Sequence, residues 1–303
     1  MPADIRYLKN KEIDRKKWDE CITNASNGLI YGYSFYLDHM AKHWDGLVMN
    51  DYEAVMPLTW NRKYGFYYLY QPFFCQALGL FGDNITKELF KAFLDSVPSK
   101  FKYWDIYLNK ENVFTLREYP FYLRTNYVLS LNESYKKLAL SYSSKHVASI
   151  KKATKEGYTF RKDVPVKDII SLAMEQSKAF SPVQENDYNN FTELYKLLHK
   201  KGKAVSYGAY KDGQLMASGI WLFSHNRAYY VLAGNHPSSR TSGASHFLLD
   251  SFIKENAGTD MILDFEGSSV ETIARFFKRF GATEEKYSAI KLNKLPPLIR
   301  LLK

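Results

Sequence analysis

Cysteine is scarce in this sequence of 303 residues, and long apolar runs are missing from it. The two cysteines, Cys21 and Cys75, are too few for a disulfide framework or a cysteine metal cage. No apolar run approaches the roughly 20 residues of a membrane-spanning helix, so we expect no stable membrane insertion. The first residues also lack the apolar core of a secretion signal, and we therefore expect a cytoplasmic protein.

Proline- and glycine-rich linkers and low-complexity tracts are also absent, so any two domains should pack together. Apolar residues make up 46% of the chain and aromatic residues 16%, which favours a well-filled core over disorder. The net charge of +10 indicates an anionic partner: a phosphorylated cofactor, a nucleic acid or a membrane surface. A soluble protein with many surface lysines explains that charge equally well.

Several common catalytic patterns are missing as well. His39 and His43 have the spacing of metal ligands on a helix predicted over residues 34–44, but no third ligand accompanies them. We therefore predict no metal site. No Gly-x-Ser-x-Gly turn occurs, and neither cysteine has an evident histidine partner.

The order of predicted elements in the second half recurs in the first half. In the second half the patterns predict a helix over 188–200, strands over 204–210, 215–223 and 228–233, a helix over 245–256, a strand over 261–266, a helix over 269–280 and a strand over 286–292. In the first half they predict helices over 14–23 and 34–44, strands over 47–49, 53–60 and 66–70, a helix over 86–97 and strands over 103–108 and 124–131. We interpret this as a duplication. Residues 133–156 between the halves read as a long helix or helix pair, with Lys145 and Lys152 near one face.

The loop before the helix at 245–256 reads Arg240-Thr241-Ser242-Gly243-Ala244-Ser245. Its small residues let an anion approach the free N–H groups of a helix N-terminus, and Arg240 can add a charged fork. Gly243 and Ala244 would let a pyrophosphate lie against the backbone. Alternatively, Ser242 or Ser245 simply caps the helix.

With its element order, this Arg-x-x-Gly-x-Ser loop resembles the Gcn5-related N-acetyltransferase (GNAT) family, whose Gln/Arg-x-x-Gly-x-Gly/Ala loop cradles the diphosphate of acetyl-coenzyme A. A more specific resemblance is to the FemAB-like branch, in which two such domains are fused. It extends over about Trp18 to Leu292 and is carried by residues 70–79, 149–153, 243–249, 264–268 and 276–282. In this chain Val147 stands where that branch often has an arginine.

This resemblance implies transfer of an acyl group to an amine. Acyl-coenzyme A is the donor we favour, and aminoacyl-tRNA is the donor in the peptidoglycan-bridging members. Those members carry a coiled-coil insertion, which no heptad pattern here indicates. By the resemblance, Leu232, Ala233, Arg240, Ser242, Gly243, Ala244 and Ser245 would hold the donor. Gln71, Gln76, Lys145 and Lys152 would contact the acceptor.

Two carboxylates, Asp264 and Glu266, end the strand predicted over 261–266 and should share one of its faces. Either could take a proton from an attacking ammonium. For Asp264 we favour a structural role, either as acceptor of backbone N–H bonds or as partner of Arg275 or Lys278. For Glu266 both roles stay open. Where the family often has a tyrosine acid, this chain has Phe277; Tyr287 could substitute, although a core role is favoured.

We therefore predict an α/β (α+β) protein of two tandem GNAT-like acyl-coenzyme A N-acyltransferase domains packed around a central cleft. Residues 1–132 would form the acceptor side, and residues 133–303, beginning with the basic helix, the donor side. The acceptor would be the amine of a small molecule or of a cell-envelope precursor. Transfer from aminoacyl-tRNA and a catalytically silent binding module are the alternatives, and the sequence leaves the oligomeric state open.

Overall fold

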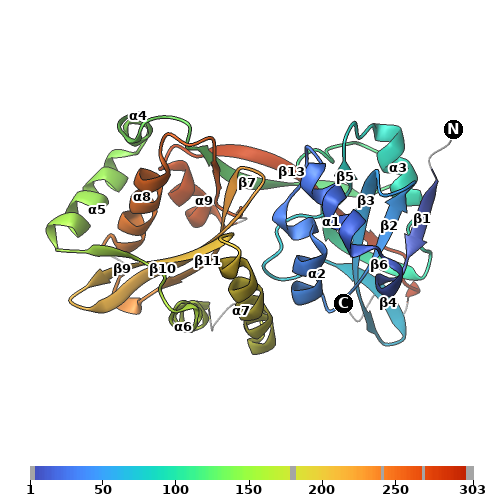
Figure 1. Ribbon diagram of the computed structural model, residues 1–303, viewed down its shortest axis with the longest axis horizontal. Helices are drawn as coiled ribbons and strands as arrows, with labels where there is room; N and C mark the ends of the chain where they lie inside the picture. The colour runs from blue at the N-terminus through green and yellow to red at the C-terminus, as the bar shows by residue number, and fades with distance from the viewer. Residues whose placement is uncertain (1–3, 178–181, 240–241, 268–269, 298–303) are drawn as a thin grey trace. The chain divides into compact units, whose positions relative to one another are not determined.

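The computed structural model describes residues 4–177, 182–239, 242–267 and 270–297. The chain forms two compact units, Met1–Arg124 with Lys286–Lys303, and Thr125–Glu285 (Figure 1). It passes from one unit to the other within strand β7 (Phe121–Ser130) and again within strand β13 (Thr283–Asn293). The first unit is therefore discontinuous in sequence. A single division of the chain after residue 132 would place β13 in the second domain.

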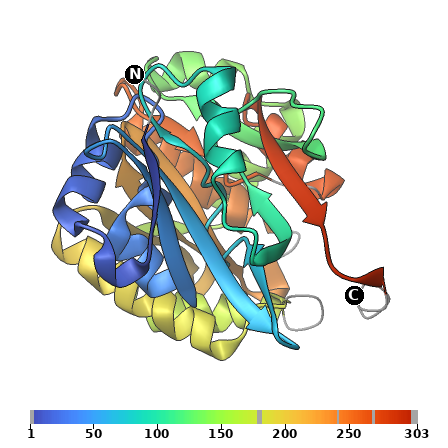
Figure 2. The ribbon, with the colours of Figure 1, turned by 90° about the vertical axis from the view of Figure 1, so that its right-hand side faces the viewer.

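The first unit is a mixed sheet with strand order β1-β2-β3-β4-β6-β13, and β5 pairs with β3. Strands β2, β3 and β4 are antiparallel, β4 and β6 are parallel, and β13 runs antiparallel to β6 (Figure 2). Its remaining elements are β1 (Ile5–Leu8), η1 (Asn10–Glu12), α1 (Arg15–Asn24), η2 (Ile30–Gly32), α2 (Ser34–Met40), β2 (His43–Met49), β3 (Ala54–Lys63), β4 (Phe66–Tyr70), β5 (Phe81–Gly82), α3 (Lys87–Asp95) and β6 (Phe101–Tyr107).

The second unit has strand order β7-β12-β11-β10-β9-β8. Figure 1 shows α5, α8 and α9 on one face of this sheet and α6 and α7 on the other. Its remaining elements are α4 (Tyr135–Leu140), α5 (Ser144–Lys155), β8 (Thr159–Lys162), α6 (Val166–Ser177), α7 (Glu185–Lys200), β9 (Ala204–Lys211), β10 (Gln214–Ser224), β11 (Arg227–Asn235), η3 (Pro237–Ser239), α8 (Ala244–Asn256), β12 (Ile262–Asp264) and α9 (Glu271–Lys278).

The two units repeat one order of elements, which confirms the predicted tandem architecture. Counted from β1 in the first unit and from β8 in the second, the order is a strand and two helices, then three antiparallel strands and a helix, and then a strand parallel to the last of those three. A sixth strand then pairs antiparallel with that fifth strand. It is β13 in the first unit and β7 in the second.

Among the predicted elements that end earlier in the structure than in the sequence pattern, two carry candidate site residues. Helix α2 stops at Met40, and His43 begins β2 opposite Trp60, so the helical pair of His39 and His43 does not exist. The next residue, Trp44, is 3% exposed with its ring 5.2 Å from that of Trp18, and the strand provides this burial. Strand β12 ends at Asp264, so the predicted strand face shared by Asp264 and Glu266 is wrong.

Candidate functional site

The parallel strands β11 and β12 diverge. They pair only from Arg227 opposite Ile262 to Tyr229 opposite Asp264, and β11 then continues to Asn235. Among the described residues, no strand lies beside that part of β11 on the β12 side. Backbone N–H and C=O groups require partners, so this edge suits an extended ligand that carries amides.

A β-bulge in β11 determines which side chains face the gap. Tyr230 pairs with Trp221 and Leu232 with Ile220, so Val231 is an extra residue on β11. The extra residue shifts the alternation, and Tyr230, Ala233 and Asn235 line a cavity of ≈ 570 Å³. The predicted donor residue Leu232 is 8% exposed and is not among the residues that line this cavity.

The cavity lies between β11, the first turn of α8, the helix α9 and the end of α6. It includes four of the predicted donor-binding residues, Ala233, Gly243, Ala244 and Ser245. Ser242 lies next to it, and its hydroxyl donates to the backbone oxygen of Ser239 at 2.9 Å. Arg240 falls outside the described residues.

The N-terminus of α8 points its backbone donors at the cavity. The N-cap residue Gly243 offers no side-chain cap, and the Ala244 N–H reaches only the Ser242 hydroxyl, at 3.3 Å. Among the described residues, the N–H groups of Ser245 and His246 have no acceptor in the protein. Unpaired donors at the positive end of a helix dipole favour an anion there.

Gly243 is also required by packing. Its φ of 84° lies in the left-handed region, and a Cβ on it would lie 2.5 Å from the backbone oxygen of Ser149 on α5. Lys145 and Lys152 lie about one turn to either side of Ser149, on the same side of α5. Both lysines are exposed, and Lys152 lies 3.8 Å from Glu156.

Residues 149–269, which include β11, α8 and β12, match the acetyltransferase (GNAT) domain family model. The chain has a tandem GNAT fold. A FemX structure aligns over 98% of this chain and 99% of its own, with a TM-score of 0.70 and 14% identity. The C-terminal domain of a putative lysylphosphatidylglycerol synthetase from Agrobacterium fabrum aligns over 96% of this chain and 95% of its own, with a TM-score of 0.57 and 13% identity.

A tandem GNAT protein from the clavulanic acid biosynthesis pathway aligns over 97% of this chain and 99% of its own, with a TM-score of 0.56 and 11% identity. A search of curated protein sequences finds no match. At these identities the structural likeness establishes the fold alone.

Asp264 of the GNAT domain is buried in an ion-pair network. It is 1% exposed and accepts from Arg227 at 2.6 Å, from the Asn126 amide at 2.9 Å and from the Glu266 N–H at 2.8 Å. Arg227 also donates to Glu285 at 2.9 and 3.0 Å. Burial raises the pKa of the Asp264 carboxyl, and Arg227 opposes that rise. The partner is therefore Arg227 and not the predicted Arg275 or Lys278, which pair with Glu271 and Glu284.

Glu266 lies just past the strand end, partly exposed, with a left-handed φ of 63°. It is not among the residues that line the cavity. Glu175, at the end of α6, does line it and is exposed. Sequence reasoning missed Glu175 because it assigned no helix there, although Ile169 and Ala173 recur at helical spacing.

His246 is a second cavity residue that the sequence did not indicate. Its ring lies edge-on to that of His146 on α5, with 4.4 Å between ring centres. Burial lowers the pKa of each histidine to about 4. Both are therefore neutral at pH 7, and they add no positive charge beside the N-terminus of α8.

Phe277 and Tyr287 lie in different units. Phe277 lines the cavity and stacks on Phe265, with 4.5 Å between ring centres. Tyr287 is 5% exposed in the first unit, where its hydroxyl accepts from Arg124 at 3.0 Å. The Arg124 guanidinium in turn lies 4.2 Å from the ring centre of Tyr107.

In the first unit, the chain itself fills the position that corresponds to the cavity of the second unit. Strand β4 stays paired with β6 up to Tyr70 opposite Asp105. The Gln71 side chain then accepts from the Tyr107 N–H at 3.0 Å and donates to the Cys75 oxygen at 2.7 Å. Leu78 follows, accepting from the Asn109 N–H at 2.7 Å. The strand edge that is open in the GNAT domain is therefore occupied by the chain itself.

The two predicted acceptor glutamines differ in their bonding. Gln71 uses its amide within the first unit, as above. The Nε2 of Gln76 is buried and has no hydrogen-bond partner among the residues that the structure describes. An oxygen atom of a bound acceptor substrate could accept a hydrogen bond from this Nε2.

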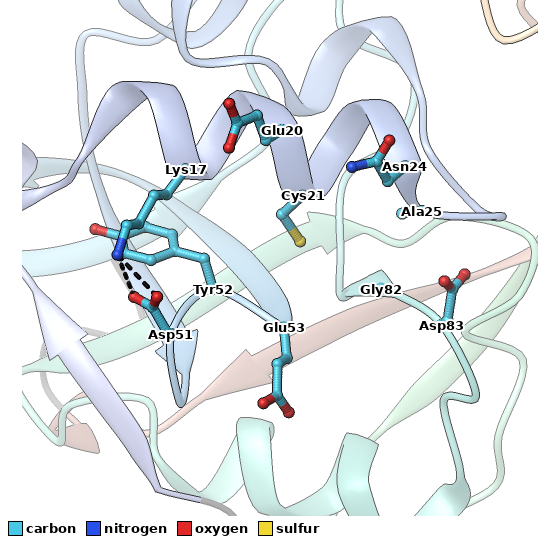
Figure 3. Close-up of a pocket in the computed structure, with 10 residues that line it drawn as sticks. All are labelled: Lys17, Glu20, Cys21, Asn24, Ala25, Asp51, Tyr52, Glu53, Gly82 and Asp83. Carbon is cyan, nitrogen blue, oxygen red and sulfur yellow. Dashed lines mark hydrogen bonds and ion pairs between the residues drawn. The ribbon is translucent and has the colours of Figure 1, made fainter.

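A smaller pocket of ≈ 300 Å³ in the first unit is acidic (Figure 3). Glu20, Glu53 and Asp83 surround it, and its Lys17 is paired with Asp51 at 2.6 Å. Burial raises the pKa of the Cys21 thiol at this pocket to about 12. Such a lining disfavours a phosphorylated donor, and the protonated thiol is a poor nucleophile.

Within the described ranges, no cluster of three or more His, Cys, Asp and Glu side chains could hold a metal ion. None of the helices described is both long enough and apolar enough to cross a membrane.

Proposed function

We propose that the protein is an N-acyltransferase that moves an acyl group from acyl-coenzyme A to an amine. One observation carries the proposal: the open edge of β11 and the N–H groups of Ser245 and His246, which have no acceptor among the described residues, border the same cavity. Acyl-coenzyme A has an extended arm with two amides and a pyrophosphate at its far end. The strand edge is complementary to the arm, and the helix N-terminus to the pyrophosphate.

The chain's own residues would position the reactants and exclude water. Phe276 and Phe277 give one wall of the cavity an apolar surface. An attacking amine must lose a proton, and a nearby carboxylate can take it. We propose Glu266 for this role from its place at the strand end, and Glu175 as the rival that lies in the cavity.

The acceptor proposal rests on the first unit and on α5. We propose that Gln76, Lys145 and Lys152 contact an amine-bearing small molecule or cell-envelope precursor. The names of two structural relatives, FemX and a lysylphosphatidylglycerol synthetase, fit an acceptor from the cell envelope. Gln71 contributes indirectly, because its amide holds the loop that carries Gln76.

Aminoacyl-tRNA is the second candidate donor. Positive side chains such as Lys145 and Lys152 would not discriminate a tRNA from coenzyme A, since both present phosphates. A catalytically silent binding module remains the third candidate, since Phe277 stands at the family's usual acid position.

Calorimetric titration with acetyl-coenzyme A tests the proposal. Ser245→Glu puts a carboxylate in the first turn of α8, where it suits the helix dipole but repels phosphate. We expect acetyl-coenzyme A to bind the variant at least about tenfold more weakly, equivalent to about 1.4 kcal/mol, with an unchanged melting temperature.

Asn186→Glu is the matched control, because Asn186 is likewise the second residue of a helix, α7, and is exposed. It should bind like the wild type. Equal affinity in all three proteins would place the donor elsewhere. Co-purified tRNA with no affinity for acetyl-coenzyme A would favour the second candidate.

A further inference from the structure

Tyr230 occupies the point where β11 and β12 diverge. The pair Tyr229 and Asp264 is the last one between these strands, so Tyr230 is the first residue of β11 past it. Its ring stacks on Trp221 with 4.6 Å between centres and an interplanar angle of 25°. A Cβ on Gly219 would lie 2.4 Å from the Tyr230 ring, so this glycine leaves the space that the ring occupies.

Tyr230 lines the cavity. Burial alone changes the pKa of its hydroxyl, and no hydrogen bond to another described residue contributes. Burial raises the pKa of Tyr230 well above its usual value of 10.0, so the hydroxyl keeps its proton at neutral pH. A protonated hydroxyl on a fixed ring is a donor for whatever atom binds opposite it.

The position of Tyr230 in the cavity indicates which atom of a bound donor its hydroxyl would face. The anion-binding end of the cavity is the N-terminus of α8, and the other end is the point of strand divergence. A donor whose phosphates lie at α8 therefore directs its thioester towards Tyr230. The hydroxyl that the family often supplies from α9 is missing here, because Phe277 stands at that position and lines the same cavity.

We propose that Tyr230 is the catalytic acid of the proposed acyl transfer. The amine nitrogen forms a bond to the carbonyl carbon, and the carbon–sulfur bond breaks with its electron pair moving to sulfur. Sulfur takes the hydroxyl proton of Tyr230. The amine's surplus proton goes to a carboxylate or water, and solvent returns a proton to the tyrosinate. This inference rests on the proposed function, with coenzyme A as the leaving thiol.

Release of coenzyme A from acetyl-coenzyme A by hydroxylamine tests the role. Hydroxylamine is uncharged at pH 7.5 and attacks without a general base, so the assay reports the acid alone. Tyr230→Phe keeps the ring on Trp221 and removes only the hydroxyl. We expect kcat to fall by about 10² to 10⁴, with the KM for acetyl-coenzyme A within about twofold of wild type. The solvent deuterium isotope effect on kcat should shrink as well.

Tyr210→Phe, the same change on β9 outside the cavity, should leave kcat and the isotope effect unchanged. Gly219→Ala should displace the ring and lower kcat, and it should cost no further kcat in the Tyr230→Phe protein. A Tyr230→Phe protein with wild-type kcat and isotope effect would overturn the inference. A wild type that neither binds acetyl-coenzyme A nor releases coenzyme A would instead overturn the proposed function.

Discussion

At the scale of single residues, Asp264 and Glu266 have different surroundings although one residue separates them. Asp264 is buried and bonded to Arg227, Asn126 and a backbone N–H. Removing one partner of a buried ion pair costs about 3–5 kcal/mol, because the other charge stays buried. Asp264→Asn should therefore unfold at lower denaturant concentration, whatever its effect on activity.

Glu266→Gln and Glu175→Gln separate the two proposed bases. The assay uses acetyl-coenzyme A as donor and, as acceptor, the amine that gives the highest turnover in a screen. With such an acceptor the reaction requires a base to remove a proton from the attacking amine. The true base should lose turnover by about 10² to 10⁴ when changed to glutamine, with donor affinity and stability near wild type. The other variant should keep its turnover. If both stay fully active, neither carboxylate is the base.

A bulkier residue at Gly243 cannot by itself test whether the loop before α8 binds phosphate. The left-handed φ of 84° at Gly243 and the 2.5 Å approach to Ser149 mean that any side chain strains the backbone and the α5–α8 contact. Loss of binding in a Gly243 variant would therefore accompany loss of stability. Ser245 is partly exposed and its hydroxyl donates to Asn235, so a change there keeps the two effects apart.

At the scale of elements, the junction of α5, α8 and α9 contains two buried histidines. His146 Nε2 lies 3.0 Å from the Phe276 oxygen. Burial lowers the pKa of His146 and of His246, and the positive charge of nearby Arg279 lowers both further. Both histidines have a pKa of about 4 in the folded protein, below the 6.5 of free histidine. The unfolded chain therefore binds protons more tightly between these pH values.

The stability that each histidine contributes is complete above pH 6.5 and is lost as the pH falls towards 4. His146→Gln keeps a donor for the Phe276 oxygen but does not titrate. Urea unfolding at pH 7, 6 and 5 should show a shallower fall in stability for the variant, by about 1 kcal/mol per pH unit. Parallel slopes for the two proteins would contradict the buried, neutral state of His146.

Sequence patterns predict hairpins and helices well where neighbouring residues determine the structure. The turn of Asp212 and Gly213 has φ values of 50° and 79°, as an Asp-Gly hairpin requires. Arg227 lies just outside the strand predicted over 228–233, but it begins β11 and is 6% exposed because the carboxylates of Asp264 and Glu285 pair with it. Sequence spacing carries no information about such partners, and it gave no sign of Glu175 or Tyr230 in the cavity.

At the scale of the whole molecule, the chain exchanges strands between its units. The first unit contains β13, which the sequence places after everything in the second. Periodicity identifies β13 as a strand but cannot tell which sheet it joins. The fold class could therefore be predicted from the sequence and the family resemblance, whereas the discontinuity of the first unit could not.

Fragment expression tests this exchange. A fragment of residues 1–132 lacks β13, which leaves the edge of β6 from Tyr103 to Tyr107 unpaired. We expect this fragment to aggregate or to unfold without cooperativity, as judged by gel filtration and circular dichroism. Co-expression with residues 133–303 should restore a soluble complex. A stable, monomeric 1–132 fragment would contradict the role of β13 in the first unit.

The location of the donor is the claim on which the rest of the account depends, and hydrogen–deuterium exchange with acetyl-coenzyme A measures it directly. Bound donor should slow amide exchange in residues 230–235 of β11 and 243–247 at the start of α8, because those N–H groups gain acceptors or lose solvent. Residues 66–80 of the first unit, already paired internally, should exchange as in the free protein. Protection confined to residues 66–80, or no protection at a saturating concentration of acetyl-coenzyme A, would contradict the account.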